Sequence, residues 1–275
     1  MDFISEVKKK AQESIGMSES DYIEGGLLCC GKCHTPKEHI IYIKGNPVTV
    51  PCLCQCGMEK RDLEIEQRML DAKARYIDRL RDKGFPDAEM SRWTFENDDW
   101  SNEKLSTTAR RYVDNWQEMK SRGKGLLLYG SVGTGKTFIS ACIANALIQM
   151  GIPCLVTNFS RLVNQLAGSQ DRQSYIDDLS KFDLIVIDDL ASERDTEYMG
   201  ELVQSIIDAR YRSGLPMIVT TNLTADELKN PADMRRQRIF SRLFEMCIPV
   251  EVKGVDRRKQ RLVNDYKDLE ALLGL

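Results

Sequence analysis

The stretch GLLLYGSVGTGKTF, residues 125–138, joins a short apolar segment to a run of glycines that ends in a lysine and a threonine. Residues 130–137 match the P-loop pattern G-x-x-x-x-G-K-S/T at every fixed position. Glycines let the backbone curl so that several N–H groups point inward, and the start of the following helix attracts anions. We therefore predict a triphosphate site rather than a chance glycine-rich turn. The predicted nucleotide-binding residues are Gly130, Ser131, Val132, Gly133, Thr134, Gly135, Lys136, Thr137 and Phe138.

Two side chains of this loop, and two acids downstream, carry the expected chemistry. We expect Lys136 to reach the outer phosphates and the hydroxyl of Thr137 to bind Mg²⁺. The segment FDLIVIDDL, residues 182–190, is an apolar run that ends in two acids. Asp188 is expected to hold the Mg²⁺, and Asp189 to polarise the attacking water as a general base. The alternative, that both acids only cap the next helix, does not explain the apolar run before them.

A third polar element is Asn222, near the end of the apolar segment PMIVTTNL, residues 216–223. The carboxyl ends of parallel strands border the crevice in which open α/β sheets bind ligands. Asn222 is therefore a candidate for orienting the water or sensing the γ-phosphate. Taken alone, TTN is equally well explained as a turn that ends a strand.

Strands and helices are expected to alternate after residue 124. The predicted strands are 125–130, 153–159, 182–190, 216–223 and 246–252, and helical patterns cover 136–149, 160–180, 196–213 and 256–272. This alternation predicts an α/β fold with a parallel sheet flanked by helices. The predicted domains are residues 1–85, a connector at 86–124, and a nucleotide-binding domain at 125–275.

The composition fits a globular protein, with 42% hydrophobic residues and a net charge of −3. No apolar run reaches the roughly 18 residues that a membrane span needs, and the N-terminus MDFISEVKKKAQ lacks the pattern of a secretory signal. We therefore expect a cytoplasmic protein that makes no membrane contact. The near-neutral charge argues against strong, non-specific binding of nucleic acid.

Six of the nine cysteines lie in the window 29–56. In a reducing cytosol such a cluster indicates a metal site more than a disulfide framework. Cys30-x2-Cys33 and Cys54-x-Cys56 supply four thiolates, a common set for structural zinc, with a predicted hairpin of 39–44 and 47–52 between them. Redox cysteines, merely buried cysteines and an iron–sulfur cluster are the alternatives. Further candidate ligands in the window are Cys29, His34, His39 and Cys52.

Outside this window the remaining sequence signals are simpler. Cys142, Cys154 and Cys247 stand alone in apolar surroundings and are predicted to be small buried side chains. Residues 58–83 are predicted to form one long charged helix with a narrow apolar stripe, which serves either as a packing seam or as a docking face. The stripe consists of Leu63, Leu70, Ile77 and Leu80.

The ordered set LLLYGSVGTGKT, DLIVIDDL, IVTTNL, RIFSRLFE and VDRRKQRL resembles the AAA+ ATPases of the DnaC/DnaI helicase-loader family over roughly residues 25–265. Some members of that family share an upstream cysteine cluster, and its pattern favours Cys30, Cys33, Cys54 and Cys56 as the zinc ligands, with Cys52 as the first substitute. The related transposase-helper ATPases share the nucleotide core, but we expect no cysteine module there.

The resemblance also implies roles for arginines near the C-terminus. Arg242, in RIFSRLF, matches the arginine finger that reaches the γ-phosphate held by a neighbouring subunit, and Arg238 is the next candidate. Arg258 matches the sensor-II position, which contacts nucleotide within one subunit, whereas Arg257 stands where the family often has an aromatic residue. Surface-exposed basic residues are the alternative. A finger acting in trans implies self-association through the ATPase domain.

The resemblance implies an ATP-dependent loader that binds the replicative hexameric helicase and delivers it onto single-stranded DNA. ATP hydrolysis is expected to be slow and to be stimulated by partner or DNA, since Asp189 replaces the glutamate that many proteins of this fold carry. The zinc module and the helix at 58–83 are the expected helicase-binding part, and Phe159 and Arg161 are candidates for contacting DNA. The alternatives are a transposition helper ATPase and a zinc-dependent adaptor that binds ATP but barely hydrolyses it.

Overall fold

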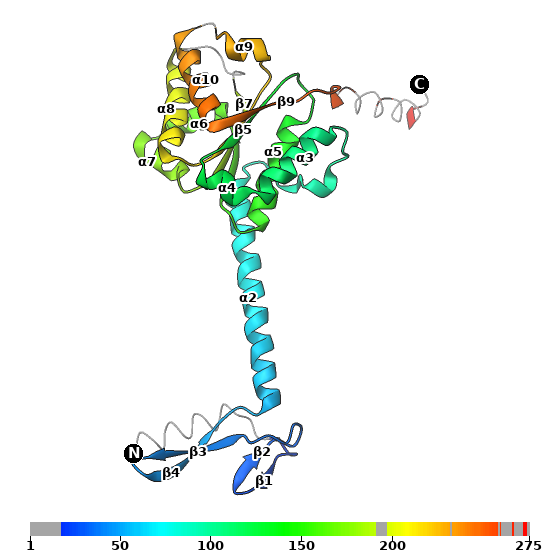
Figure 1. The fold of residues 1–275 in the computed structure, drawn as a ribbon, viewed down its shortest axis with the longest axis vertical. Helices are drawn as coiled ribbons and strands as arrows, with labels where there is room; N and C mark the ends of the chain where they lie inside the picture. The colour runs from blue at the N-terminus through cyan, green and yellow to red at the C-terminus, as the bar shows by residue number, and fades with distance from the viewer. Residues whose placement is uncertain are drawn as a thin grey trace. The chain divides into compact units, whose positions relative to one another are not determined.

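The structure is a computed structural model that describes residues 18–190, 197–231 and 233–257, together with residues 259, 266, 272 and 273 (Figure 1). It divides into two compact units, Met1–Ala74 and Arg75–Leu275. A long helix, α2 (Gln55–Gly84), begins in the first unit and ends in the second. The helix predicted at 58–83 is therefore confirmed and starts three residues earlier.

The first unit contains two antiparallel hairpins. The predicted hairpin is confirmed, and its strands are joined by Lys44 and Gly45, which both have positive φ. Positive φ at both central residues is the geometry of the tight turn that suits the twist of a hairpin. The strands of this unit are β1 (Tyr22–Glu24), β2 (Leu27–Cys29), β3 (Glu38–Ile43) and β4 (Asn46–Pro51).

This first unit buries few apolar side chains. Within residues 18–74, the buried hydrophobic residues are the cysteines Cys29, Cys30 and Cys54. Ile23 and Tyr42, by contrast, expose 76% and 74% of their surface. A unit with so little apolar burial needs another source of stability, because ordering each residue costs conformational entropy.

The second unit is built on five parallel strands in the order β6-β7-β8-β5-β9. Strands that are buried on both faces read as continuous apolar runs, and the inner strands of the sheet contain such runs: LIVI, MIV and LLL. The predicted parallel α/β sheet is confirmed. Its strands are β5 (Gly125–Tyr129), β6 (Cys154–Asn158), β7 (Leu184–Leu190), β8 (Met217–Thr221) and β9 (Cys247–Glu251).

Helices cover both faces of this sheet (Figure 1). Side chains alternate along β5, so that Leu127 joins one hydrophobic cluster with α6, α8 and α10, and Leu128 joins another with α3, α4 and α5. The helices of this unit, besides the end of α2, are η1 (Met90–Arg92), η2 (Phe95–Asn97), α3 (Glu103–Asp114), α4 (Trp116–Ser121), α5 (Lys136–Gln149), α6 (Phe159–Gly168), α7 (Arg172–Leu179), α8 (Glu197–Ser213), α9 (Ala225–Lys229) and α10 (Met234–Met246).

Residues that precede the first strand of the sheet also contribute to the hydrophobic core. Trp116, on α4, exposes 1% of its surface and packs in the same cluster as Phe85 and Leu105. The connector therefore covers one face of the sheet. The helix predicted at 256–272 lies mostly outside the described residues.

Candidate nucleotide site and cysteine cluster

The predicted phosphate loop connects β5 to α5. Gly130, Gly133 and Gly135 have φ values of 132°, 76° and 94°, a region that side chains disfavour. The Lys136 amine donates hydrogen bonds to the carbonyls of Gly130 (2.8 Å) and Ser131 (2.7 Å) and so lies across the inside of the loop. The loop, its lysine and the start of α5 form the cradle for phosphate that the sequence predicts.

The two predicted acids lie at the carboxyl end of β7, beside this loop. The Thr137 hydroxyl donates to both oxygens of Asp188, at 2.9 and 3.1 Å. Burial raises the pKa of the Asp188 carboxyl, and the hydroxyls of Thr220 and Thr137 oppose that rise. Thr137 and Asp188 together offer hard oxygen donors of the kind that Mg²⁺ prefers. The Asn222 amide donates to Asp189 at 2.9 Å, which brings the third predicted element to the same place.

A cavity of about 550 Å³ surrounds these groups. Its wall includes residues that the sequence analysis did not select: Glu89, Trp93, Asn97, Asp99, Thr220 and Arg257. Trp93 lies against Phe138, with ring centroids 5.9 Å apart, and Asn145 on α5 donates to the carbonyls of Met90 and Trp93 at 3.1 and 2.8 Å. In the sequence, Asn145 stands out as a polar residue within the mostly apolar segment ISACIANALI, residues 139–148. Such a residue indicates that another segment packs against this helix and accepts its hydrogen bonds.

Arg257 closes another side of the cavity. Its backbone N–H donates to the carbonyl of Gly133 at 3.0 Å, and its guanidinium lies 3.1 Å from a carboxylate oxygen of Asp99. It also donates to the hydroxyl of Ser101. A permanently charged group over the glycine loop suits a polyanionic ligand. Arg258, the predicted sensor-II residue, lies outside the described residues.

The two arginines predicted to act in trans lie on α10. The Arg242 guanidinium is 2.7 Å from a carboxylate oxygen of Asp208 and 5.1 Å from the centre of the Tyr211 ring. Arg238 is exposed. Neither belongs to the described residues that line the cavity of their own chain, so the structure does not bring them to Lys136.

The prediction that the Phe159 side chain contacts DNA is wrong. Its side chain is fully buried and packs in the cluster beneath α6. Phe159, Leu162, Val163 and Leu166 follow the spacing of a buried helical face, and that spacing was readable in the sequence. Arg161 is exposed on the same helix.

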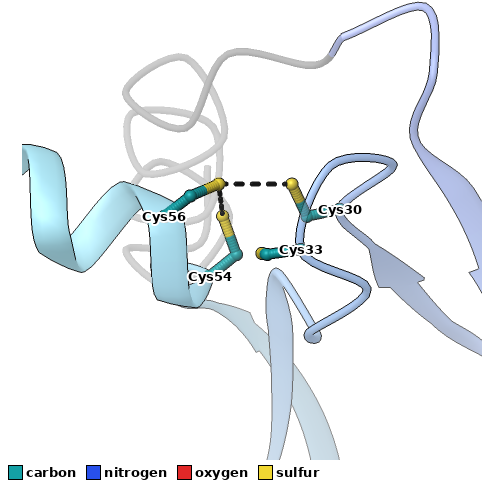
Figure 2. Close-up of side chains that lie close together, drawn as sticks. All are labelled: Cys30, Cys33, Cys54 and Cys56. Carbon is teal, nitrogen blue, oxygen red and sulfur yellow. Dashed lines mark hydrogen bonds between the residues drawn. The ribbon is translucent and has the colours of Figure 1, made fainter.

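The structure brings together the four preferred cysteines. The sulfur atoms of Cys30, Cys33, Cys54 and Cys56 lie within 4.8 Å of one another. Figure 2 shows them converging: Cys30 and Cys33 come from the loop after β2, Cys54 from the residue just before α2, and Cys56 from the first turn of α2. The sulfurs of Cys30 and Cys54 lie 3.6 and 3.5 Å from that of Cys56. Four sulfurs around one zinc at 2.3 Å stand about 3.8 Å apart, so the set fits a structural zinc.

The loops around the cluster hold the thiols in place. Hydrogen bonds from the Cys56 backbone and from the side chain and backbone of Thr35 lower the pKa of the Cys33 thiol to about 5. Hydrogen bonds that Cys56 makes with the other three thiols raise its own pKa to about 12. One carboxylate oxygen of Asp21 accepts from the Gly31 N–H at 3.1 Å, and the other lies 2.5 Å from the Lys37 amine.

The other candidate ligands in the window do not join the described cluster. Cys52 lies 3.6 Å from the carbonyl of Pro36, Cys29 lies 3.8 Å from that of Leu27, and His34 contacts the hydroxyl of Tyr22 at 3.1 Å. His39 is an exposed residue of β3. The arrangement of this unit therefore separates the four from their nearest competitors.

Comparison with protein families gives a match for residues 87–264, to the family described as IstB-like ATP binding protein. The chain belongs to this IstB-like ATP-binding family. The match covers well over half of the chain and includes the phosphate loop, both acids and Asn222.

The chain is also similar to curated replicative helicase loaders. The chain is 27% identical over 150 residues to the replicative helicase loader DnaI of Bacillus subtilis, covering 50% of this chain and 48% of that protein. It is 28% identical over 126 residues to DnaC of Escherichia coli, covering 44% of this chain and 50% of that protein. The chain thus matches about half the length of these relatives.

Solved structures with the same fold include DnaI, with a TM-score of 0.54 and 26% identity over 65% of this chain and 99% of that chain. A structure of the DnaC helicase loader has a TM-score of 0.52 and 25% identity over 60% of this chain and 99% of that chain. The resemblance to the DnaC/DnaI family and the AAA+ P-loop fold are therefore confirmed. Within the described residues, every helix is too short or too polar to cross a membrane.

Proposed function

We propose that this protein is an ATP-dependent helicase loader that binds a replicative hexameric helicase and helps to place it on single-stranded DNA when replication begins. The observation that carries the proposal is the contact between Thr137 and Asp188 beneath the phosphate loop, in a chain similar to DnaI and DnaC. That contact supports the assignment of Thr137 and Asp188 as a pair of Mg²⁺ ligands beside the phosphate loop. The protein is proposed to act in the cytoplasm.

ATP binding follows from the groups that line the cavity. Backbone N–H groups of residues 130–137 and the Lys136 amine would bind the phosphates, and Thr137 and Asp188 would hold the Mg²⁺, which would neutralise phosphate charge. Asp189, held by the Asn222 amide at 2.9 Å, accepts the proton of the attacking water. Arg257 contributes positive charge from the same chain, and the sensor-II role predicted for Arg258 remains part of the proposal.

Hydrolysis is proposed to need a second copy of the chain. Arg242 is tied to Asp208 on its own surface, and in an oligomer it would exchange this pairing for the γ-phosphate of the neighbouring subunit, with Arg238 one turn earlier as the next candidate. Slow hydrolysis in the isolated chain follows, because the charge that stabilises the transition state is then absent.

Zinc is proposed to hold the N-terminal unit, with Cys30, Cys33, Cys54 and Cys56 as its ligands. Closed four-cysteine sites stabilise folds rather than perform chemistry. The surface so formed, with the exposed Leu63 and Leu70 of α2, is the proposed contact for the helicase. This part of the proposal concerns residues before 87, which lie outside the family match.

ATP binding and turnover are tested with purified full-length chain. Wild type is expected to bind a fluorescent ATP analogue and hydrolyse ATP slowly, Lys136→Ala to lose binding, and Asp189→Asn to keep binding while losing turnover. A wild-type protein that binds ATP but shows no turnover with single-stranded DNA and helicase would favour the zinc-dependent adaptor. No binding at all would refute the proposal.

Helicase binding is tested by pull-down with the full chain. Wild type is expected to retain the helicase, and a Cys30→Ser/Cys33→Ser variant to lose it while still binding ATP. The rival function, a transposition helper, is favoured by 34% identity over 118 residues to a putative insertion sequence ATP-binding protein of Sinorhizobium fredii. Filament formation on double-stranded DNA without helicase binding would select that rival.

A further inference from the structure

The strand pairing beside the two acids contains an irregularity. Ile187 of β7 pairs with Val219 of β8, but the next paired positions are Leu190 and Thr221. Two residues of β7, Asp188 and Asp189, therefore lie where β8 has one, Thr220. Such a bulge bends the strand and redirects side chains, and it leaves a backbone group without its partner in the ladder.

Thr220 supplies the missing contacts at this bulge. Its side-chain hydroxyl accepts the backbone N–H of Asp189 at 2.9 Å and donates to a carboxylate oxygen of Asp188 at 2.5 Å. The residue exposes 2% of its surface. A hydroxyl has one proton and accepting lone pairs, so a single group here serves both acids.

The backbone of Asp189 shows why such a contact is needed. Its φ is +61°, a conformation that residues other than glycine rarely adopt. Conformations of this kind persist only where surrounding contacts maintain them. The Thr220 hydroxyl binds the N–H of that residue, and the Asn222 amide binds its carboxylate.

We propose that Thr220 is a positioning residue for Mg²⁺-ATP: its hydroxyl directs the Asp188 carboxylate toward Thr137 and sets the backbone from which Asp189 faces the water. This inference rests on the proposed ATPase function. Asp188 receives two hydroxyl donors, Thr137 and Thr220, and in the proposed function Thr137 is itself a metal ligand. Thr220 is then the donor whose only role is orientation.

The neighbouring Thr221 provides a matched control. It is also buried, on the same strand, and its hydroxyl likewise makes two contacts: it donates to the carbonyl of Leu190 at 2.8 Å and accepts the backbone N–H of Leu223 at 3.2 Å. Among the residues that the structure describes, no hydrogen bond joins Thr221 to Asp188. Replacing either threonine by valine keeps its shape and removes one buried hydroxyl.

The test compares Thr220→Val, Thr220→Ser and Thr221→Val in the full-length protein. We measure the dissociation constant of a fluorescent ATP analogue in EDTA and in Mg²⁺, together with kcat and KM. Thr220→Val is expected to bind the analogue in EDTA as wild type does, within about twofold. Its Mg²⁺-dependent gain in affinity and its kcat should each fall about 10–100-fold, the usual effect of losing an outer-shell partner. Thr220→Ser should restore both, and Thr221→Val should change neither.

Other outcomes would overturn the inference without touching the proposed function. These are a Thr220→Val protein with wild-type Mg²⁺ dependence and kcat, or an equal loss in Thr221→Val, which would indicate general damage to β8. If Thr220→Val does not fold, the pair Thr220→Ser and Thr220→Ala isolates the same hydroxyl, and equal behaviour of that pair contradicts the inference. Absence of ATP binding in wild type would instead refute the proposed function.

Discussion

The cysteine unit, residues 18–74, and the nucleotide-binding unit, residues 75–257, bury different kinds of side chain. In the first, the described buried apolar residues are three cysteines, two of which belong to the four-thiol cluster. In the second, aliphatic and aromatic side chains fill both faces of a five-stranded sheet. A small unit without a core relies on a metal, whereas a larger one is stabilised by burial. The two units should therefore respond to different perturbations.

Removing the metal should have the largest effect. A chelator, or Cys54→Ser, is expected to abolish hydrogen-exchange protection in residues 18–54, because structural zinc contributes roughly 10–16 kcal/mol of apparent binding free energy in small modules. The melting temperature of the nucleotide-binding unit should change by less than about 2 °C. Cys52→Ser is the control and should retain zinc. Persistent protection in metal-free protein would show that the first unit folds without metal.

Damaging the hydrophobic core should have the next largest effect. It should destabilise the nucleotide-binding unit and leave the cysteine unit unchanged. Trp116→Ala is expected to destabilise the nucleotide-binding unit by about 3–5 kcal/mol, because this side chain is 1% exposed, while zinc content stays at one equivalent. Chemical denaturation and metal analysis measure the two effects. Met150→Ala, at a residue that is 56% exposed, should stay within about 0.5 kcal/mol. Equal effects of both substitutions would exclude α4 from the core.

A smaller effect is expected from the support of the cysteine loop. Asp21→Asn weakens the contacts to Gly31 and Lys37, and we expect zinc to leave about tenfold faster, as is usual when outer contacts of a site are lost. A chromogenic chelator follows the release. Asp62→Asn, on the exposed surface of α2, should release zinc at the wild-type rate. Equal rates for all three proteins would contradict a supporting role for Asp21.

The smallest effect concerns one helix that belongs to both units. Leu70 is 55% exposed, so Leu70→Ala should change the free energy of unfolding by less than about 0.5 kcal/mol. Ile77, two turns later on α2, packs against the hydrophobic cluster that contains Leu128. Ile77→Ala should therefore lower the free energy of unfolding by about 1–2 kcal/mol. Reversed effects would place Leu70 in a core. A loss of helicase binding by Leu70→Ala alone would assign it to the docking face.

The parts of the site that the sequence predicted are those with fixed local spacing. Residues 130–137 follow a contiguous motif, and Asp188 ends an apolar run, so both were readable without a fold. The four proposed zinc ligands were chosen over Cys52 only through the family pattern, because spacing alone allows several sets. The sheet was predictable for a similar reason, since buried parallel strands are continuous apolar segments.

The parts that were missed depend on contacts between distant segments. Trp93 reaches the cavity from the connector, and Arg257 meets Asp99 across more than 150 residues of chain. No local pattern marks such residues. The bulge at Asp188 and Asp189 was also hidden, because it is a property of how β7 pairs with β8. Phe159 was misassigned for a different reason: an aromatic residue was weighed by its chemistry rather than by the helical spacing around it.

The burial of Cys142, Cys154 and Cys247 has a consequence for the protein under oxidative conditions. Burial raises the pKa of all three thiols, to about 12 for Cys142 and Cys247, so they are neither ionised nor accessible to peroxide or alkylating reagents. Oxidation of cysteine should therefore begin in the N-terminal unit, whereas the three buried thiols of the nucleotide-binding unit are protected. If the cluster holds zinc as proposed, oxidation of the N-terminal thiols would release the metal and leave the thiols of the nucleotide-binding unit reduced.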